Sequence, residues 1–166
     1  MPGPKVLVLL GPTAAGKSEL ARRLARRFNG EVISADSRQV YQGLNIGTGK
    51  ITQRERCGIR HHLLDVADPK RRFSVAKFKR LAERAIKDIL RRGQLPIVCG
   101  GTGFYIQALV DNLILPPVPL RSRLRQTLVK LSTAELLARL QALDPERAKQ
   151  IDHYNPRRLI RAIEIV

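Results

Sequence analysis

The sequence predicts an α/β fold in which a parallel sheet is flanked by helices. Short apolar runs alternate with longer segments of helical spacing, and this order is typical of parallel strands joined by crossover helices. Residues 11–18 read Gly-Pro-Thr-Ala-Ala-Gly-Lys-Ser, between the apolar run 6–10 and the amphipathic segment 19–28. This is the strand, loop and helix context of a phosphate-binding loop, so we expect a P-loop NTPase-like sheet.

The first unit of the sheet is a strand at 5–10, the loop at 11–18 and a helix. Apolar residues at helical spacing continue to Phe28, and Asn29-Gly30 is a pair that ends helices in the left-handed conformation. Gly11 and Gly16 allow the loop backbone to curl around an oxyanion, and the positive end of the helix dipole adds to that site.

A second strand is expected at 31–35, with Asp36 at its carboxyl end. The glycine-rich stretch 42–60 is predicted to be a loop, and 62–66 a short strand. A long helix fits residues 74–92, with Ser74 as N-cap and Gly93 as the stop signal. A buried strand at 96–99 then leads into Gly100-Gly101-Thr102-Gly103 and a helix from about residue 104.

Three polar or glycine-rich segments, 11–18, 36–39 and 100–103, therefore follow strands. Ligands of such sheets bind beyond the carboxyl ends of the strands, so these segments are expected to form one crevice. Kinases place a magnesium-sensing carboxylate at a strand end, whereas the strand at 96–99 ends in glycine. Asp36 is a candidate general base or magnesium ligand, with Asp65 as the other nearby acid. The Thr102 hydroxyl suits a diphosphate or leaving oxygen, which favours a diphosphate-binding transferase.

A segment with three prolines, 113–119, marks a domain boundary. We expect a P-loop α/β core at 1–112 and a helical segment at 113–166. Helix signals in the second part are residues 121–131, the capping box Ser132–Glu135, and the caps Asp144-Pro145 and Asn155-Pro156. The segment 157–166 ends on an apolar run without a cap, so the helical extension is expected to be truncated.

The chain of 166 residues carries 31 Lys and Arg against 14 Asp and Glu, a net charge of +17. Such a charge favours a polyanionic partner, most often nucleic acid, although the arginines between 22 and 27 fit a solvated helix face. Cys57 and Cys99 lack metal-site spacing and indicate a reducing, cytoplasmic setting. No signal peptide or long apolar run is evident, so no membrane association is expected.

Several ordered blocks resemble the tRNA dimethylallyltransferase (tRNA isopentenyltransferase) family, and they cover nearly the whole chain. They are Gly11 to Ser18, Asp36 to Tyr41, Ile46-Gly47-Thr48, His61 to Asp65, Phe73 to Phe78, Gly100 to Tyr105, Leu143-Asp144-Pro145 and Arg157 to Glu164.

The resemblance implies transfer of a dimethylallyl group from dimethylallyl diphosphate to N6 of an adenine beside the tRNA anticodon. It implies Asp36 as the base for the adenine amine and Thr102 as a donor to the departing diphosphate. The phosphate loop would hold the diphosphate rather than ATP, with Lys17 and a Mg²⁺ ion on Ser18 neutralising its charge. A monomer in the cytoplasm is expected, with the tRNA anticodon stem-loop as partner.

The implied site residues form two sets. The diphosphate-binding set is Gly11, Pro12, Thr13, Ala14, Ala15, Gly16, Lys17 and Ser18. The tRNA-binding set is Asp36, Ser37, Arg38, Gln39, Thr102, Arg121, Arg157, Arg158, Leu159, Ile160 and Arg161. His61 and His62 are assigned structural roles, because adjacent residues of an extended segment point to opposite faces.

The chain departs from the family pattern at Ala15, where serine is usual, and at Gly49 and Ile51 on either side of Lys50. Family members also continue well past residue 166. Three alternatives stay open. They are a transferase that prenylates free adenine nucleotides, a small-molecule P-loop kinase, and a non-catalytic RNA-binding fragment.

Overall fold

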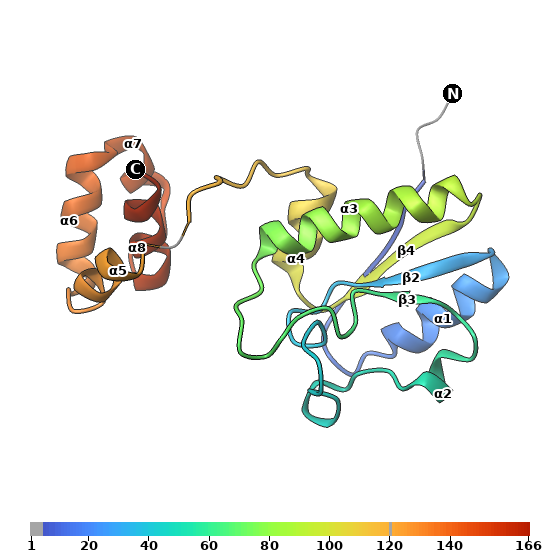
Figure 1. Cartoon of the computed structure of the whole chain (residues 1–166). Helices are drawn as coiled ribbons and strands as arrows, with labels where there is room; N and C mark the ends of the chain where they lie inside the picture. Colours follow the sequence, from blue (N-terminus) through green and yellow to red (C-terminus); the bar gives the residue numbers. More distant parts are fainter. Residues whose placement is uncertain (1–4, 120) are drawn as a thin grey trace. The chain divides into compact units, whose positions relative to one another are not determined.

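A computed structural model of the chain describes residues 5–119 and 121–166 (Figure 1). The chain forms two compact units, the first ending at Ile114 and the second beginning at Leu115. Each is considered by itself. None of the helices in the described ranges has the length and apolar character needed to cross a membrane.

The first unit is built on a parallel four-stranded sheet in the order β1-β4-β2-β3. The strands are β1 (Leu7–Leu10), β2 (Gly30–Ser34), β3 (His61–His62) and β4 (Leu95–Gly100). Val98 of β4 is in register with Val8 on one side and Ile33 on the other. This sheet confirms the predicted fold class.

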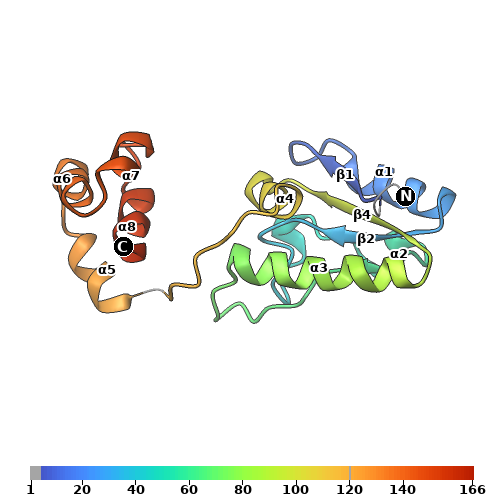
Figure 2. The same ribbon diagram turned by 90° about the horizontal axis from the view of Figure 1, so that it is seen from above.

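Helices cover both faces of the sheet (Figures 1 and 2). They are α1 (Lys17–Arg27) and α2 (Gln53–Arg56), with the 3₁₀ turn η1 (Ile46–Thr48) between β2 and α2, and then α3 (Val75–Arg91) and α4 (Gly103–Val110). Ala21 and Ala25 of α1 pack against Val32 and Ile97, whose side chains point to one face. Their small size lets the helix lie close to the strands.

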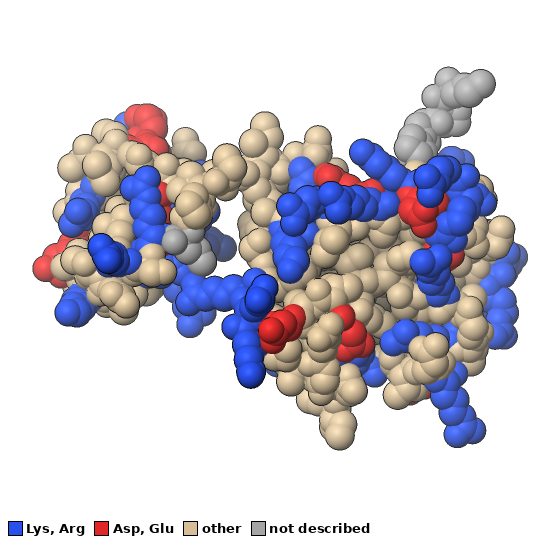
Figure 3. Space-filling view, viewed as in Figure 1, with Lys and Arg blue, Asp and Glu red and all other residues tan. Residues whose placement is uncertain are grey.

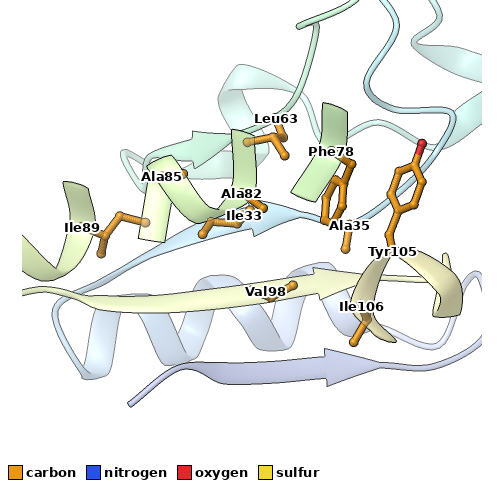
Figure 4. Packing of buried hydrophobic residues seen from close by; sticks show 10 residues of the cluster. All are labelled: Ile33, Ala35, Leu63, Phe78, Ala82, Ala85, Ile89, Val98, Tyr105 and Ile106. Carbon is orange, nitrogen blue, oxygen red and sulfur yellow. The ribbon is translucent and has the colours of Figure 1, made fainter. Parts of the chain in front are cut away.

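The larger core lies on the opposite face, beneath α3 and α4 (Figure 4). Ile33 and Val98 from the sheet meet Ala82 and Ile89 from α3, all of them fully buried. Phe78 stacks on Tyr105 of α4 with ring centroids 4.3 Å apart. This face therefore holds α3 and α4 against the sheet.

The loop region between β2 and α3 differs from the sequence prediction. The expected strand at 62–66 is only His61–His62, because Leu63 and Asp65 have φ values of 64° and 58°, which end the extended conformation. The stretch predicted as loop contains η1 and α2. The latter begins with a capping box in which Thr52 and Glu55 bond reciprocally, a signal visible in the sequence.

A buried carboxylate ties β2, β3 and the end of α3 together. Glu31 is 5% exposed and accepts hydrogen bonds from both terminal nitrogens of Arg92, while His62 Nε2 lies 2.6 Å from its Oε2. The Arg92 hydrogen bonds lower the pKa of Glu31 to about 2, against the opposing effect of burial, and His62 adds to the lowering. His61 instead bonds the Ile59 carbonyl through Nδ1, so both histidines have structural partners.

Glu31→Gln is expected to lower the free energy of unfolding near neutral pH by about 2 kcal/mol, the scale of a charged hydrogen bond. A depressed folded-state pKa stabilises the fold above the ordinary glutamate pKa of 4.5, and this stabilisation fades as the pH falls towards 2. Urea unfolding at pH 7 and pH 2.5 should show the gap between wild type and variant closing. Glu83→Gln on α3 is the control, and an unchanged gap would contradict the linkage.

The secondary structure of the second unit, in its described residues, consists of helices joined by short turns. Its elements are α5 (Ser122–Leu128), α6 (Thr133–Leu143), α7 (Pro145–Gln150) and α8 (Pro156–Ile165). The expected caps at Ser132, Asp144 and Asn155 are all confirmed by side-chain bonds to backbone amides. Leucines and isoleucines of α5, α6 and α8 form its core.

A buried ion cluster holds α5 against α8. Burial alone would raise the pKa of the fully buried Glu164, but Arg125 and Arg161 lower it below its usual range. Arg125 bonds both carboxylate oxygens, at 3.0 and 2.8 Å.

Candidate active site

The phosphate-loop sequence lies between the end of β1 and the start of α1, as predicted. The backbone takes left-handed conformations at Ala14 (φ 63°) and at Gly16 (φ 72°), the N-cap of α1. Gly16 provides no side-chain cap, so the first amide groups of α1 have no side-chain acceptor there. Such free amides at the positive end of a helix dipole are suited to bind an anion.

Lys17 brings a positive charge into the loop. Its Nζ donates to the Pro12 carbonyl, and its Cδ lies 3.5 Å from the position that a Cβ on Gly11 would occupy. The side chain is therefore folded back along the loop while the next residue, Ser18, stays exposed. The Lys17 ammonium and the Ser18 hydroxyl thus both lie at the phosphate loop.

Asp36 follows β2 in a tight turn. Its Oδ1 accepts hydrogen bonds from the backbone amides of Arg38 (2.8 Å) and Gln39 (3.3 Å). One oxygen is thus used to fix the carboxylate, and no hydrogen bond among the described residues occupies Oδ2. A carboxylate held in this way is oriented to accept a proton or hydrogen bond with its second oxygen.

The Asp36 turn and the glycine-rich segment after β4 are joined directly. Thr102 Oγ1 accepts a hydrogen bond from the Ser37 amide at 2.9 Å and lies 3.3 Å from Ser37 Oγ. A Cβ on Gly100 would come within 2.2 Å of the Ala35 carbonyl oxygen, so this close approach requires glycine. Thr102 therefore holds the Asp36 turn, a contact that the sequence did not reveal.

A cavity of about 480 Å³ unites these parts. Its walls include residues 13–18 of the phosphate loop, Asp36, Gln39 and residues 99–101. Thr102, Ser37 and Arg38 are not among its lining residues. The convergence of the three predicted segments is confirmed, with Thr102 placed behind the cavity wall rather than in it.

A fourth wall, residues 48–55, comes from the stretch 42–60 that the sequence predicts as loop, and no local signal marks it as part of the site. Thr48, Gly49, Ile51 and Glu55 line the cavity. Gln39 Nε2 donates to the carbonyl oxygens of Thr48 (3.2 Å) and Gly49 (3.3 Å), which fastens this wall to the Asp36 turn.

The buried Lys50 anchors the same wall. Its Nζ lies 2.6 Å from Asp65 Oδ1 and 2.6 Å from the Tyr41 carbonyl oxygen, and its side chain is only 3% exposed. Asp65, the other acid considered at a strand end, is thus committed to Lys50. Asp36 is the carboxylate of the two that faces the cavity.

Two neighbouring groups stay protonated near neutral pH. Burial raises the pKa of the Cys99 thiol, with Lys17 opposing the shift. Burial, assisted by Tyr41 and Asp36, raises the pKa of Tyr105 to about 12. These pKa values make a thiolate or phenolate nucleophile unfavourable.

Two other carboxylates, Glu19 and Glu55, line the cavity. Glu19 is paired with Arg22, and Glu55 caps α2 through Thr52. Asp36 is therefore the base candidate of the cavity.

The residues expected to contact RNA in the second unit differ in exposure. Arg121, Arg157 and Arg158 are exposed. The side chains of Leu159 and Ile160 are 0% and 6% exposed and belong to the core. The apolar side of α8 packs inward, so these two side chains do not face a partner, and the assignment of both residues to RNA contact stays a prediction.

Arg161 also has an internal role. Its Nη2 donates to the Val118 carbonyl at 2.9 Å, and its Nη1 lies 3.4 Å from Glu164. It stabilises the connection into the second unit, which leaves Arg157 and Arg158 as the exposed cations at the start of α8.

The sequence is similar to proteins of one family. The family model described as IPP transferase matches residues 39–166. The tRNA dimethylallyltransferase of Anoxybacillus flavithermus is 51% identical over 163 residues, which cover 98% of this chain and 52% of that protein. That of Acidothermus cellulolyticus is 49% identical, with the same two shares. The chain thus spans about half the length of these curated relatives.

Solved structures agree with the sequence comparison. A tRNA isopentenylpyrophosphate transferase from Bacillus halodurans superposes with a TM-score of 0.67 at 44% identity, covering 97% of this chain and 55% of that one. A eukaryotic dimethylallyltransferase acting on tRNA superposes with a TM-score of 0.84 at 36% identity, covering 98% and 41%.

Proposed function

The chain belongs to the IPP transferase family, and we propose that it holds dimethylallyl diphosphate and presents the base for its transfer to an adenine of tRNA. The observation that carries this proposal is the single cavity in which the phosphate loop and the Asp36 carboxylate face one another. A diphosphate and a nucleophile placed there would meet without large movements, which is the main requirement of a transfer between two substrates.

The acceptor is proposed to be N6 of an adenine next to the tRNA anticodon. An exocyclic amine is a poor nucleophile because its lone pair is delocalised into the ring. Asp36 Oδ2 would accept the amine proton as the N–C bond forms, while Oδ1 stays bound to the amides of Arg38 and Gln39. The base must leave the RNA stack to reach the cavity, which costs a few kcal/mol.

The leaving group is proposed to be stabilised by the phosphate loop. The amides at the start of α1 and the Lys17 ammonium would take up the negative charge that develops as the allylic C–O bond breaks. Thr102 keeps the Asp36 turn in place, and its hydroxyl would donate to the diphosphate only by giving up its contact with Ser37 Oγ.

Magnesium fits this site as a cation shared with the diphosphate. The described residues hold no cluster of three metal-ligating side chains, but in a phosphate-binding loop the hydroxyl of the residue after the lysine binds Mg²⁺ beside the phosphates. The exposed Ser18 hydroxyl beside the loop meets that need. When bound, Mg²⁺ supplies positive charge at the diphosphate.

The RNA is proposed to be held by exposed cations, with the tRNA anticodon stem-loop as the primary partner. The net charge of +17 and the exposed Arg121, Arg157 and Arg158 support an electrostatic contribution to that binding. We propose a cytoplasmic monomer, since the cavity draws all its walls from one unit and Cys57 and Cys99 are both free thiols.

The test is incubation of the chain with dimethylallyl diphosphate, Mg²⁺ and an adenine-rich anticodon stem-loop, followed by mass spectrometry of the RNA. Calorimetry of dimethylallyl diphosphate binding is measured in parallel, because the chain spans half the length of its relatives. We expect diphosphate binding and prenylated RNA. Prenylation of free adenine nucleotides instead would favour the nucleotide enzyme, and RNA binding without diphosphate binding would favour a non-catalytic role.

A further inference from the structure

Helix α3 carries an unassigned row of basic residues. Its members are Lys77, Arg80, Arg84, Lys87 and Arg91, and we refer to them as the α3 basic stripe. Their spacing of three and four residues places them along one side of the helix. The buried Phe78, Ala82, Ala85 and Ile89 lie on the other side, so the stripe faces away from the core.

The charges of this stripe are poorly neutralised. Glu83 lies 3.6 Å from Lys79, and Asp88 bonds Arg91 and Arg92 at 2.8 and 3.0 Å. Within the described ranges, Arg80, Arg84 and Lys87 have no carboxylate at ion-pair distance. Figure 3 shows basic side chains gathered over α3, with some acidic ones beside them.

The nearest opposite charges on α3 are engaged elsewhere. Glu83, three residues after Arg80 and four before Lys87, pairs with Lys79. Asp88, four residues after Arg84, bonds Arg91 and Arg92. Surface helices are usually stabilised by opposite charges three or four residues apart, whereas like charges at that spacing repel. Here Arg80, Arg84 and Lys87 are successive like-charged neighbours. A bound polyanion would remove that repulsion.

The position of the stripe relates it to the cavity. Because α3 precedes β4 in a parallel sheet, its first turn lies near the carboxyl edge of the sheet, where the cavity is, and its end lies near the opposite edge. At 1.5 Å per residue, the stripe is about 20 Å long. A small substrate is too short to contact a row of basic side chains of this length, whereas the backbone of a folded RNA presents phosphates along all of it.

We propose that the α3 basic stripe binds the phosphate backbone of tRNA. The bound part of the tRNA would be the one that extends away from the anticodon loop, whose adenine enters the cavity. This presupposes the RNA substrate proposed above. The stripe would contribute affinity without reading sequence, since lysine and arginine contacts to phosphates position an RNA but do not identify its bases.

The test compares two triple variants that remove the same charge. The stripe variant is Arg80→Gln, Arg84→Gln and Lys87→Gln, and the control is Arg23→Gln, Arg26→Gln and Arg27→Gln on α1, which covers the opposite sheet face. Glutamine has a similar helix propensity to lysine and arginine, so both helices should persist. Filter binding of a full-length tRNA transcript is measured from 50 to about 200 mM salt.

We expect the stripe variant to lose about 10- to 100-fold in tRNA affinity and its salt slope to fall by about 2 to 3, for three lost phosphate contacts. In the control, the decrease in the logarithm of the tRNA affinity should be less than about a third of the decrease in the stripe variant. Dimethylallyl diphosphate affinity should stay unchanged in both.

Equal losses in the two triple variants would mean that only net charge matters, and wild-type affinity in the stripe variant would mean that α3 does not touch the RNA. Either result overturns the assignment. If the wild-type chain itself does not bind tRNA, both the assignment of the stripe and the proposal of an RNA substrate are contradicted. Intact tRNA binding with an unaffected stripe variant leaves the proposed function standing.

Discussion

Asp36→Asn is expected to slow dimethylallyl transfer by roughly 10²–10⁴, the usual cost of losing a general base. Asparagine keeps the size of the side chain and an oxygen that can accept the amides of Arg38 and Gln39, so the turn should persist. It removes the negative charge and the basicity of the second oxygen. Diphosphate affinity should stay equal or rise, because an anion beside the phosphate loop is lost.

The matched control is Asp68→Asn. Asp68 also accepts the backbone amide two residues ahead, at 2.8 Å from Lys70, but it does not line the cavity. Single-turnover transfer and diphosphate calorimetry are measured for both variants. The substitution is also made in a full-length family member that carries an aspartate at the matching position, so that the rate is read even if this chain alone turns over slowly.

Two results would contradict the assignment of Asp36 as base. A wild-type transfer rate in the full-length variant would remove the aspartate from the chemistry. A loss of magnesium-dependent diphosphate affinity would instead make Asp36 a ligand of the metal. Loss of a base lowers the transfer rate, whereas loss of a metal ligand lowers diphosphate affinity. The two measurements therefore distinguish the two roles of Asp36.

The parts of the site that could be predicted are those with local signals. The loop at 11–18 is defined by glycine and lysine spacing, and Asp36 by its place directly after an apolar run. Convergence of the three strand ends followed from the parallel topology alone. The confirmed caps at Ser132, Asp144 and Asn155 are likewise decided within four residues of the chain.

The parts that could not be predicted depend on contacts distant in sequence. The bond between Ser37 and Thr102 joins residues 65 positions apart, and only the close packing of Gly100 on Ala35 brings them together. The 48–55 wall is held by Gln39 and by the buried Lys50, which pairs with Asp65, and neither contact has a periodic pattern in the sequence. A resemblance likewise assigned Leu159 to RNA contact, whereas its place on the apolar side of α8 buries it.

Among single substitutions, the largest effect on diphosphate binding is expected at Lys17. Lys17→Ala is expected to weaken dimethylallyl diphosphate binding by about 1.5–3 kcal/mol, the scale of a hydrogen bond to a charged group. The ammonium now bonds the Pro12 carbonyl, which is exposed and would be hydrated when the lysine is removed. Alanine also favours the first turn of α1, so the fold should be preserved.

Arg23→Ala is the matched control for Lys17→Ala, because it removes one positive charge from the same helix at an exposed position outside the cavity. Calorimetry with dimethylallyl diphosphate should show a loss in Lys17→Ala and near wild-type affinity in Arg23→Ala. A similar small loss in both variants would indicate only a general field of the basic surface. Undiminished affinity in Lys17→Ala would mean that the loop at 11–18 does not hold the diphosphate, and the transferase chemistry proposed for this cavity would have to be abandoned.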